Sequence, residues 1–336
     1  MNKFKSFLEN KNRSFIPIWF MRQAGRYLPE FRKIRKKNPN FINLCLNSGL
    51  SSEITLQPIK RFDLDAAIIF SDILMVPYAL NQNVVFKKDI GPVLSEFNIK
   101  KFLSNNKLEF TKKLSPIYNA IKITRKKLDK RKSLIAFVGA PWTLIIYMMG
   151  LKTKNNKFDI KKYNKKINEI NLILDDLIEY LKLHIKNQIN AGADIVQIFD
   201  SWAGLIPENK LNDYCYQPNL ELSSFCLKND VPAILFPKGI NNKYSEFVSV
   251  VQPQIINIDY NLKPEWAVKK LNGACIQGGM DPSILLGSEK EMLNEAERYL
   301  KVFKNYPYIF NLGHGLLPET NPDKVSKLIK FVRDYK

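Results

Sequence analysis

The chain has 336 residues, of which 45% are hydrophobic and 12% aromatic, enough to fill a sizeable core and too many for a disordered protein. Its 52 Lys and Arg residues against 32 Asp and Glu give a net charge of +20, which suits nucleic acid, a membrane surface or a polyanionic small molecule as a partner. The lysines are scattered beside Asn and Ile, however, and form no concentrated block. We therefore attribute most of the excess to compositional bias and expect neither a nucleic-acid nor a membrane partner.

The cysteines and the N-terminal residues indicate a cytoplasmic protein. The four cysteines have no C-x-x-C pairing and stand near apolar neighbours, so we expect buried thiols in a reducing compartment. They are Cys45, Cys215, Cys226 and Cys275. Residues 1–12 are charged and lack the roughly 7 to 15 apolar residues of a signal peptide, and no window approaches about 18 apolar residues.

Short apolar or β-branched runs recur along the chain, separated by segments with helical periodicity or by polar turns. The eight runs that we interpret as strands are residues 15–20, 66–70, 134–138, 194–199, 233–236, 255–258, 274–277 and 308–311. The predicted helices are residues 108–127, 159–190, 212–228, 243–250, 263–271 and 289–303. This alternation predicts an α/β fold, a single (β/α)8 TIM-type barrel that forms one catalytic domain over residues 1–336.

One connection in this pattern is too long for a simple crossover. Residues 74–131 exceed one helix and its loops, which predicts an insertion after the second strand, with a hairpin around residues 84–92. We find no internal repeat beyond the alternation of strands and helices, and no Pro/Gly linker that would mark a second domain.

Polar or glycine-rich residues follow every predicted strand. In a (β/α)8 barrel the active site lies at the C-terminal ends of the strands, so these positions are the candidates for chemistry. They are residues 22–26, 71–72, 139–142, 200–201, 238–239, 259–260, 278–281 and 313–315.

Two arginines at the first of these positions, Arg22 and Arg26, lie four residues apart with Gly25 between them. A glycine lets the backbone approach a ligand closely, and guanidinium groups can bind carboxylates or phosphates bidentately. The alternative is a pair of surface arginines tied to Glu30 or to a neighbouring helix. At a barrel mouth we favour ligand binding.

Asp72 stands between two apolar runs, residues 67–70 and 73–76. A carboxylate in that position is either a helix N-cap or a site residue. Close to arginines, a buried carboxylate could accept hydrogen bonds from N–H groups of a cationic or electron-rich ring and stabilise positive charge that develops on it.

The two histidines of the chain differ in their surroundings. His184 lies in an apolar part of the predicted helix 159–190, where we expect a structural role. His314 is flanked by glycines at a strand exit, so its imidazole can reach a ligand with little steric cover, and we expect a functional role.

Three further polar residues are weaker candidates. Tyr147 and Ser201 lie past strand exits and could position hydrogen bonds, although each taken alone is more typical of a structural residue. Lys238 could form a Schiff base in an aldolase-like barrel or be a loop cation, and spacing does not decide between the two.

The sequence lacks a phosphate-binding loop, a dinucleotide glycine motif, a nucleophile elbow and a zinc-ligand pattern, so it implies no nucleotide or metal cofactor.

Several segments, in chain order, resemble the uroporphyrinogen decarboxylase family. The longest, residues 17–32, reads PIWFMRQAGRYLPEFR and resembles the family's N-terminal signature. The others are LQP at 56–58, FSDIL at 70–74, FVGAPWTL at 137–144, FDSWAG at 199–204 and NLGHG at 311–315. Together they span nearly the entire chain.

The resemblance implies a homodimeric (β/α)8 barrel that turns the four acetate side chains of the tetrapyrrole uroporphyrinogen III into methyls, giving coproporphyrinogen III, without a cofactor. The residues that it places in the substrate site are Arg22, Gln23, Ala24, Gly25, Arg26, Asp72, Tyr147, Ser201 and His314. Asp72 would accept hydrogen bonds from pyrrole N–H groups and stabilise a cationic intermediate, and Arg22 is also a candidate for assisting proton transfer. A protonated pyrrole is itself an electron sink, which replaces the one that an organic cofactor supplies elsewhere.

Three rival interpretations have different requirements. A methyltransferase of the same superfamily, with a zinc-activated thiol and a corrinoid, would need clustered His and Cys ligands, which this sequence lacks. An aldolase would use Lys238 as a Schiff-base lysine. An RNA-binding protein is suggested by charge alone, and no aromatic and basic module supports it.

Overall fold

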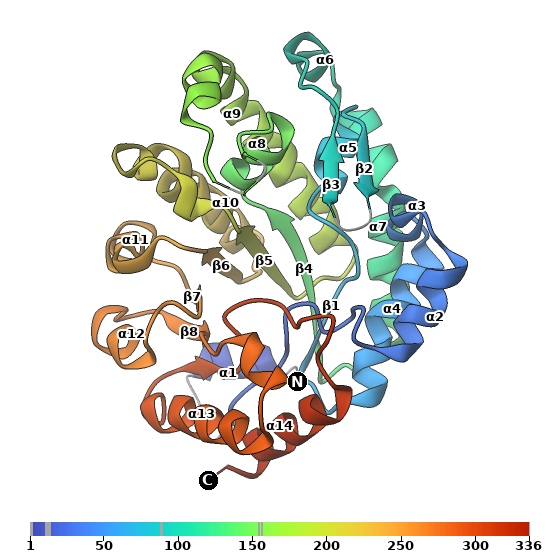
Figure 1. The fold of residues 1–336 in the computed structure, drawn as a ribbon. Coiled ribbons are helices and arrows are strands. Elements are labelled where there is room, and N and C mark those ends of the chain that lie inside the picture. The colour runs from blue at the N-terminus through green and yellow to red at the C-terminus, as the bar shows by residue number, and fades with distance from the viewer. Residues whose placement is uncertain (1–2, 11–14, 88–89, 154, 156, 336) are drawn as a thin grey trace.

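A parallel sheet of seven strands forms the centre of the computed structural model, which describes residues 3–10, 15–87, 90–153, 155 and 157–335. The strands follow one another in chain order and the sheet curls as in a barrel (Figure 1). They are β1 (Ala66–Ile68), β4 (Ser133–Gly139), β5 (Ile195–Asp200), β6 (Ala233–Pro237), β7 (Ile255–Ile258), β8 (Cys275–Gly278) and β9 (Tyr308–Ile309). Every pairing is parallel, as the predicted crossovers require.

The first predicted strand, residues 15–20, is wrong as a strand, because it forms a single parallel bridge between Ile18 and Phe310. On one side, the Phe310 N–H donates to the Pro17 carbonyl over 2.8 Å. On the other, the Asp65 N–H donates to the Ile18 carbonyl over 2.9 Å. Pro17 has no N–H to extend the ladder, so this segment links β9 to β1 without becoming a strand.

Helices on the outside of the sheet connect the strands (Figure 1). The predicted helices are confirmed as α7 (Lys107–Lys127), α9 (Ile160–Asn190), α10 (Gln217–Leu227), α11 (Tyr244–Val251), α12 (Pro264–Lys270) and α13 (Glu289–Val302). One difference is that α10 is preceded by a π-helical turn, Asn212–Tyr216, which was predicted as part of the same helix. Outside the insertion, the helices that were not predicted are α1 (Lys3–Asn10), α2 (Pro29–Lys37), α3 (Phe41–Cys45), α4 (Ser48–Arg61), α8 (Pro141–Met148) and α14 (Pro322–Asp334).

The predicted insertion follows β1. It contains α5 (Met75–Ala79), the antiparallel pair β2 (Val84–Lys87) and β3 (Gly91–Leu94), and α6 (Ile99–Leu103). The hairpin is confirmed, while residues 88–89 of the prediction lie outside the described residues.

Alternate residues of the strands face two different hydrophobic layers. Ile135, Ile195 and Ile255 point into the barrel, where Phe4 and Phe7 of α1 join the same cluster. These isoleucines lie near the starts of their strands, so α1 packs at the N-terminal end of the barrel and leaves the opposite end to the site.

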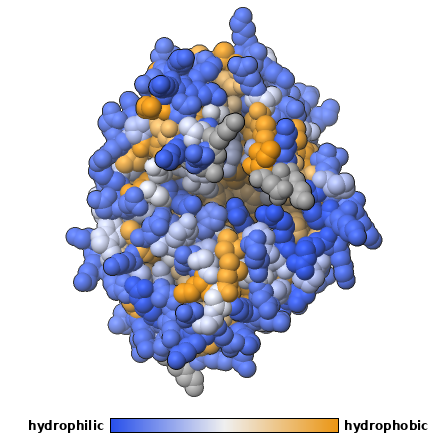
Figure 2. All heavy atoms as spheres, in the orientation of Figure 1, coloured by the Kyte–Doolittle hydropathy of each residue, from blue (hydrophilic) through white to orange (hydrophobic). Residues whose placement is uncertain are grey.

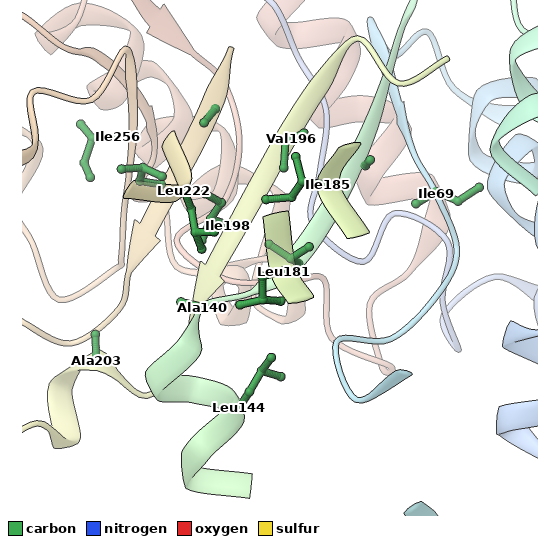
Figure 3. Packing of buried hydrophobic residues seen from close by; sticks show 14 of the residues in the cluster. Ile69, Ala140, Leu144, Leu181, Ile185, Val196, Ile198, Ala203, Leu222 and Ile256 are labelled. Atoms are coloured by element: carbon green, nitrogen blue, oxygen red, sulfur yellow. The ribbon is translucent and has the colours of Figure 1, made fainter. Parts of the chain in front are cut away.

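The outer layer lies between the sheet and the helices. Val196 and Ile198 of β5 belong to the same cluster as Leu181 and Ile185 of α9, and Figure 3 shows these side chains near one another. Because successive side chains of a strand point to opposite faces of the sheet, a continuous run of isoleucine and valine contributes to both layers.

The expectation of buried cysteines is confirmed. All four cysteines are buried free thiols. Hydrophilic side chains cover most of the face in Figure 2, with small hydrophobic patches and a hollow near its centre. Among the described helices, none combines the length and the apolar character needed to cross a membrane. One catalytic domain over residues 1–336 stays a prediction.

Candidate active site

The sequence candidates gather at the C-terminal ends of the strands. Asp72 follows β1, Lys238 follows β6 and His314 follows β9, while Arg22 follows the segment that bridges to Phe310. Since the strands are parallel, these exits share one end of the barrel. Arg22 acts electrostatically on Asp72, Lys238 and His314, which places all four within one site.

The backbone of Arg22 has a left-handed conformation, with φ of 58°. A residue with a Cβ adopts this region at a cost of about 1 kcal/mol or more, and such outliers concentrate at functional sites. The flanking hydrogen bonds hold it there: the Met21 N–H donates to Asn311 Oδ1 over 3.2 Å, and the Leu316 N–H donates to the Met21 carbonyl over 3.0 Å. These bonds fix the backbone next to Arg22 to the segment that follows β9, and the left-handed turn sets the direction of the Arg22 side chain.

The guanidinium of Arg22 is crowded by protein although the residue remains exposed to solvent. Burial lowers its pKa, the neighbouring Arg26 lowers it further, and the Asp72 carboxylate opposes both effects. The two arginines are therefore close enough to repel each other, as expected for a site that awaits an anion.

The two carboxylate oxygens of Asp72 differ in their hydrogen bonds. Its Oδ1 accepts a hydrogen bond from the Leu74 N–H over 2.9 Å in an Asx-type turn, whereas the N-cap of the following helix is Leu74, so the N-cap alternative is wrong. Oδ2 has no hydrogen-bond partner among the residues that the structure describes. Burial raises the pKa of Asp72 to about 6, against the opposing effects of the Leu74 hydrogen bond and of Arg22.

Tyr147 lies on α8 and not at a strand exit, and the helix brings its phenol back to the site. Burial raises the pKa of Tyr147, and the charges of Asp72 and Arg22 also act on it. Its ring packs edge-on against Trp202, with centroids 6.2 Å apart. Trp202 directly follows Ser201, so the same contact keeps the Ser201 segment beside Tyr147.

A buried carboxyl group holds that segment in place. Thr143 Oγ1 donates to Asp200 Oδ1 over 2.8 Å and accepts from the Trp202 N–H over 3.1 Å. Burial raises the pKa of Asp200 to about 6, and hydrogen bonds from Thr143, Cys215 and Asn219 partly offset this rise. Sequence reasoning missed this arrangement, although Asp200 and Thr143 both stand within the segments that carry the resemblance.

His314 is half-buried at the exit of β9. Burial lowers its pKa to about 3, and the positive charges of Arg22 and Lys238 lower it in the same direction. The imidazole is therefore neutral at physiological pH, with one nitrogen able to donate and the other able to accept a hydrogen bond.

The residues between the two arginines build the turn. Gln23 donates from Nε2 to the Ala66 carbonyl over 3.0 Å and accepts at Oε1 from the Phe20 N–H over 3.1 Å, so its side chain ties the turn to β1. Ala24 packs against the hydrophobic core. A Cβ on Gly25 would lie 3.1 Å from the Arg22 carbonyl oxygen, which makes glycine the best fit. Direct ligand contacts of Gln23, Ala24 and Gly25 stay predictions.

The other histidine has the structural role that we expected. His184 is buried and its Nδ1 lies 3.0 Å from the Tyr118 hydroxyl. In the described ranges, His, Cys, Asp and Glu side chains form no group of three or more that could hold a metal ion.

Fold and site together define a parallel α/β barrel whose strand exits carry the cations Arg22, Arg26 and Lys238 around the carboxylate of Asp72. The chain belongs to the uroporphyrinogen decarboxylase family, whose profile matches residues 1–335.

Named relatives agree with this assignment, and a solved structure shares the fold. The uroporphyrinogen decarboxylase of Orientia tsutsugamushi (strain Ikeda) is 41% identical over 344 residues, covering 100% of this chain and 99% of the relative. That of Rickettsia bellii (strain RML369-C) is 42% identical over 330 residues and covers 95% of each. A methyltransferase from Methanosarcina mazei superposes with a TM-score of 0.80 over 99% of this chain and 98% of its own, at 14% identity, which shows a shared fold alone.

Proposed function

We propose that this chain is a carboxy-lyase of porphyrin and haem biosynthesis, which converts uroporphyrinogen III to coproporphyrinogen III by decarboxylating its four acetate side chains. The observation that carries the proposal is the free Oδ2 of Asp72, next to the Arg22 cation at the barrel mouth. A carboxylate there can face the N–H groups of a pyrrole while arginines bind the acidic side chains around the ring.

The chemistry begins with protonation of an electron-rich pyrrole carbon. The ring then carries positive charge, and the bond between the acetate methylene and its carboxylate breaks with its electron pair moving into the ring. Carbon dioxide leaves, the exocyclic carbon takes up a proton to become a methyl, and the ring loses the proton it first gained. Asp72 stabilises the cationic stage, because a negative charge in a partly dehydrated site interacts strongly with a developing positive one. With a pKa of about 6, Asp72 is mostly ionised at pH 7.

Arg22 and Arg26 supply the complementary charge. Both would bind substrate carboxylates, and Arg22 would also assist proton transfer, since burial and Arg26 weaken its hold on its proton. Tyr147, Ser201 and His314 would complete the substrate site through hydrogen bonds. The electron sink is the protonated substrate, so the proposed reaction needs no cofactor.

Two further properties belong to the proposal, the first implied by the family resemblance and the second expected from the sequence. The chain would act as a homodimer. It would also work in the cytoplasm, where a reducing environment suits its four buried free thiols.

The test is anaerobic incubation of the purified protein with uroporphyrinogen III, followed by oxidation and chromatographic counting of carboxylates. We expect products with seven to four carboxylates to appear stepwise, to persist with a chelator present, and to be lost in Asp72→Ala. An unchanged eight-carboxylate substrate with folded wild-type protein would refute the proposal.

A further inference from the structure

Lys238 is a third cation at the barrel mouth whose role the proposed reaction leaves open. The Lys238 N–H donates to the Asp200 carbonyl over 3.1 Å, and the Gly204 N–H donates to the Lys238 carbonyl over 2.9 Å. Its backbone is thus fixed between the exits of β5 and β6. Its Nζ lies 5.9 Å from the centre of the Tyr260 ring, so the side chain reaches across the exit of β7.

The β9 exit loop lies between Lys238 and Arg22. At one end of this loop, a Cβ on Gly313 would lie 2.4 Å from the Tyr260 nitrogen. At the other end, a Cβ on Gly315 would lie 2.4 Å from Arg22 Cδ. His314, between the two glycines, is therefore bracketed by the Lys238 side of the mouth and by Arg22.

The two cations have carboxylates near them but no ion-pair partner in the described part of the chain, since Asp72 acts electrostatically on Arg22 and Asp259 acts on Lys238. No carboxylate among the described residues forms an ion pair with Arg22 or Lys238. Asp259, the carboxylate that acts on Lys238, already accepts from the Gly239 N–H over 2.7 Å and from the Asn261 N–H over 2.9 Å. Burial and the charge of Arg22 both lower the pKa of Lys238, against the opposing effect of Asp259.

We propose that Arg22 and Lys238 hold one carboxylate of the substrate between them, in front of the imidazole of His314. This inference rests on the proposed function and names a subsite within it. A carboxylate placed there removes the repulsion between the cations, and His314 adds a hydrogen bond without adding charge. Lys238 is thus a binding residue and takes no part in bond breaking.

The test compares steady-state kinetics of the full-length protein with those of Lys238→Met and Lys238→Arg. Loss of one charge-assisted contact should raise KM for uroporphyrinogen III by about tenfold to a hundredfold and leave kcat nearly unchanged. Lys238→Arg should restore much of the loss. Lys269→Met, which removes an exposed lysine from α12, is the matched control for net charge and should behave as wild type. Should Lys238→Met fail to fold, Lys238→Gln replaces it.

A binding measurement separates this inference from the proposed function. Uroporphyrin, the stable oxidised ring with eight carboxylates, is titrated against each variant by fluorescence. A weaker Kd in Lys238→Met than in Lys269→Met supports the carboxylate site, even if wild-type protein does not turn over uroporphyrinogen. Equal Kd and KM values in these two variants would overturn it.

Discussion

Gly315 lies directly against the side chain of Arg22. A Cβ at position 315 would be 2.4 Å from Arg22 Cδ and 2.5 Å from its Cγ, too close for non-bonded carbon atoms. The first half of the Arg22 side chain therefore depends on a glycine almost 300 residues away along the chain.

Gly315→Ala should consequently move Arg22 out of its position and lower kcat/KM by about tenfold or more, because misplacement of a site residue by about 1 Å is costly. The left-handed backbone of Arg22 limits how its side chain can respond. Gly49→Ala is the control, since a Cβ there meets only Asn47 Oδ1, at an ordinary contact distance of 3.6 Å, and Gly49, like Gly315, has no positive φ. The idea fails if Gly315→Ala keeps full activity while a structure of the variant shows Arg22 unmoved.

Ionisation of Asp72 predicts the acidic side of the pH profile. The carboxylate must be charged to stabilise a cationic ring, and burial raises its pKa to about 6. Activity should therefore fall as the pH drops below about 6, approaching a tenfold loss per pH unit. Asp72→Asn should lower kcat on the order of a hundredfold and abolish this inflection in whatever activity remains.

Asp200 supplies the control for that profile, because burial also raises its pKa to about 6. Asp200 lies behind the site, where Thr143 bonds to it. Asp200→Asn should therefore still show the loss of activity below about pH 6. If this inflection disappeared in Asp200→Asn, the titrating carboxylate would be Asp200 and not Asp72.

The same pKa shift predicts a gain in stability on removing the charge. An unfolded Asp has a pKa near 3.9, so a folded value of about 6 means that the ionised form destabilises the fold, fully above pH 6 and less as the pH falls toward 4. At pH 8, Asp72→Asn should raise the free energy of unfolding by about 1 to 2 kcal/mol, less than full burial would give because Asp72 keeps some solvent exposure. Urea denaturation at pH 8 and pH 4.5 measures this, and an equal effect at both pH values would contradict it.

Strand order and strand exits were predictable because both depend on local patterns. The apolar runs become strands wherever they are bounded by turns, and parallel pairing brings their C-terminal ends together, which is why Asp72 and His314 could be placed in one site. The strand predicted at residues 15–20 was wrong for a local reason too. Its apolar residues are typical of a strand, but Pro17 lacks the N–H that would extend the ladder.

Features that depend on long-range contacts were out of reach. Hydrogen bonds from the Asn311 and Leu316 segment hold Arg22 in its left-handed conformation, and the residues next to Arg22 in the sequence do not predict it. Tyr147 reaches the site because α8 follows β4 immediately. The sequence placed Tyr147 past the exit of this strand but did not predict the helix that carries it. The sequence also could not show that Arg22 and Lys238 lie on either side of His314, because this depends on the exits of β6 and β9 lying close together in the folded barrel.

Both histidines should remain neutral across the physiological range. Burial lowers the pKa of His184 and of His314 to about 3, whereas an unfolded histidine titrates near 6.5. The unfolded chain therefore binds more protons between these values, so the stability contributed by each neutral imidazole is full above pH 6.5 and is lost as the pH falls toward 3. With two histidines in the chain, NMR of labelled imidazoles between pH 5 and 8 should show two signals that do not move. A signal that titrates near pH 6.5 would show that its imidazole is solvated.

Thr143 should matter for substrate binding although it need not touch the substrate. Its hydroxyl donates to Asp200 Oδ1 and accepts from the Trp202 N–H, so Thr143→Val removes both bonds while keeping the shape. Two buried polar groups then lose a partner, and the free energy of unfolding should fall by about 1 to 3 kcal/mol. Because Trp202 packs on Tyr147 and adjoins Ser201, we expect KM to rise more than kcat falls. Thr143→Ser, which keeps the hydroxyl, should recover most of both losses. If Thr143→Ser were as impaired as Thr143→Val, the lost methyl group and its packing would be the cause, and the hydrogen-bonded chain from Asp200 would not position the site.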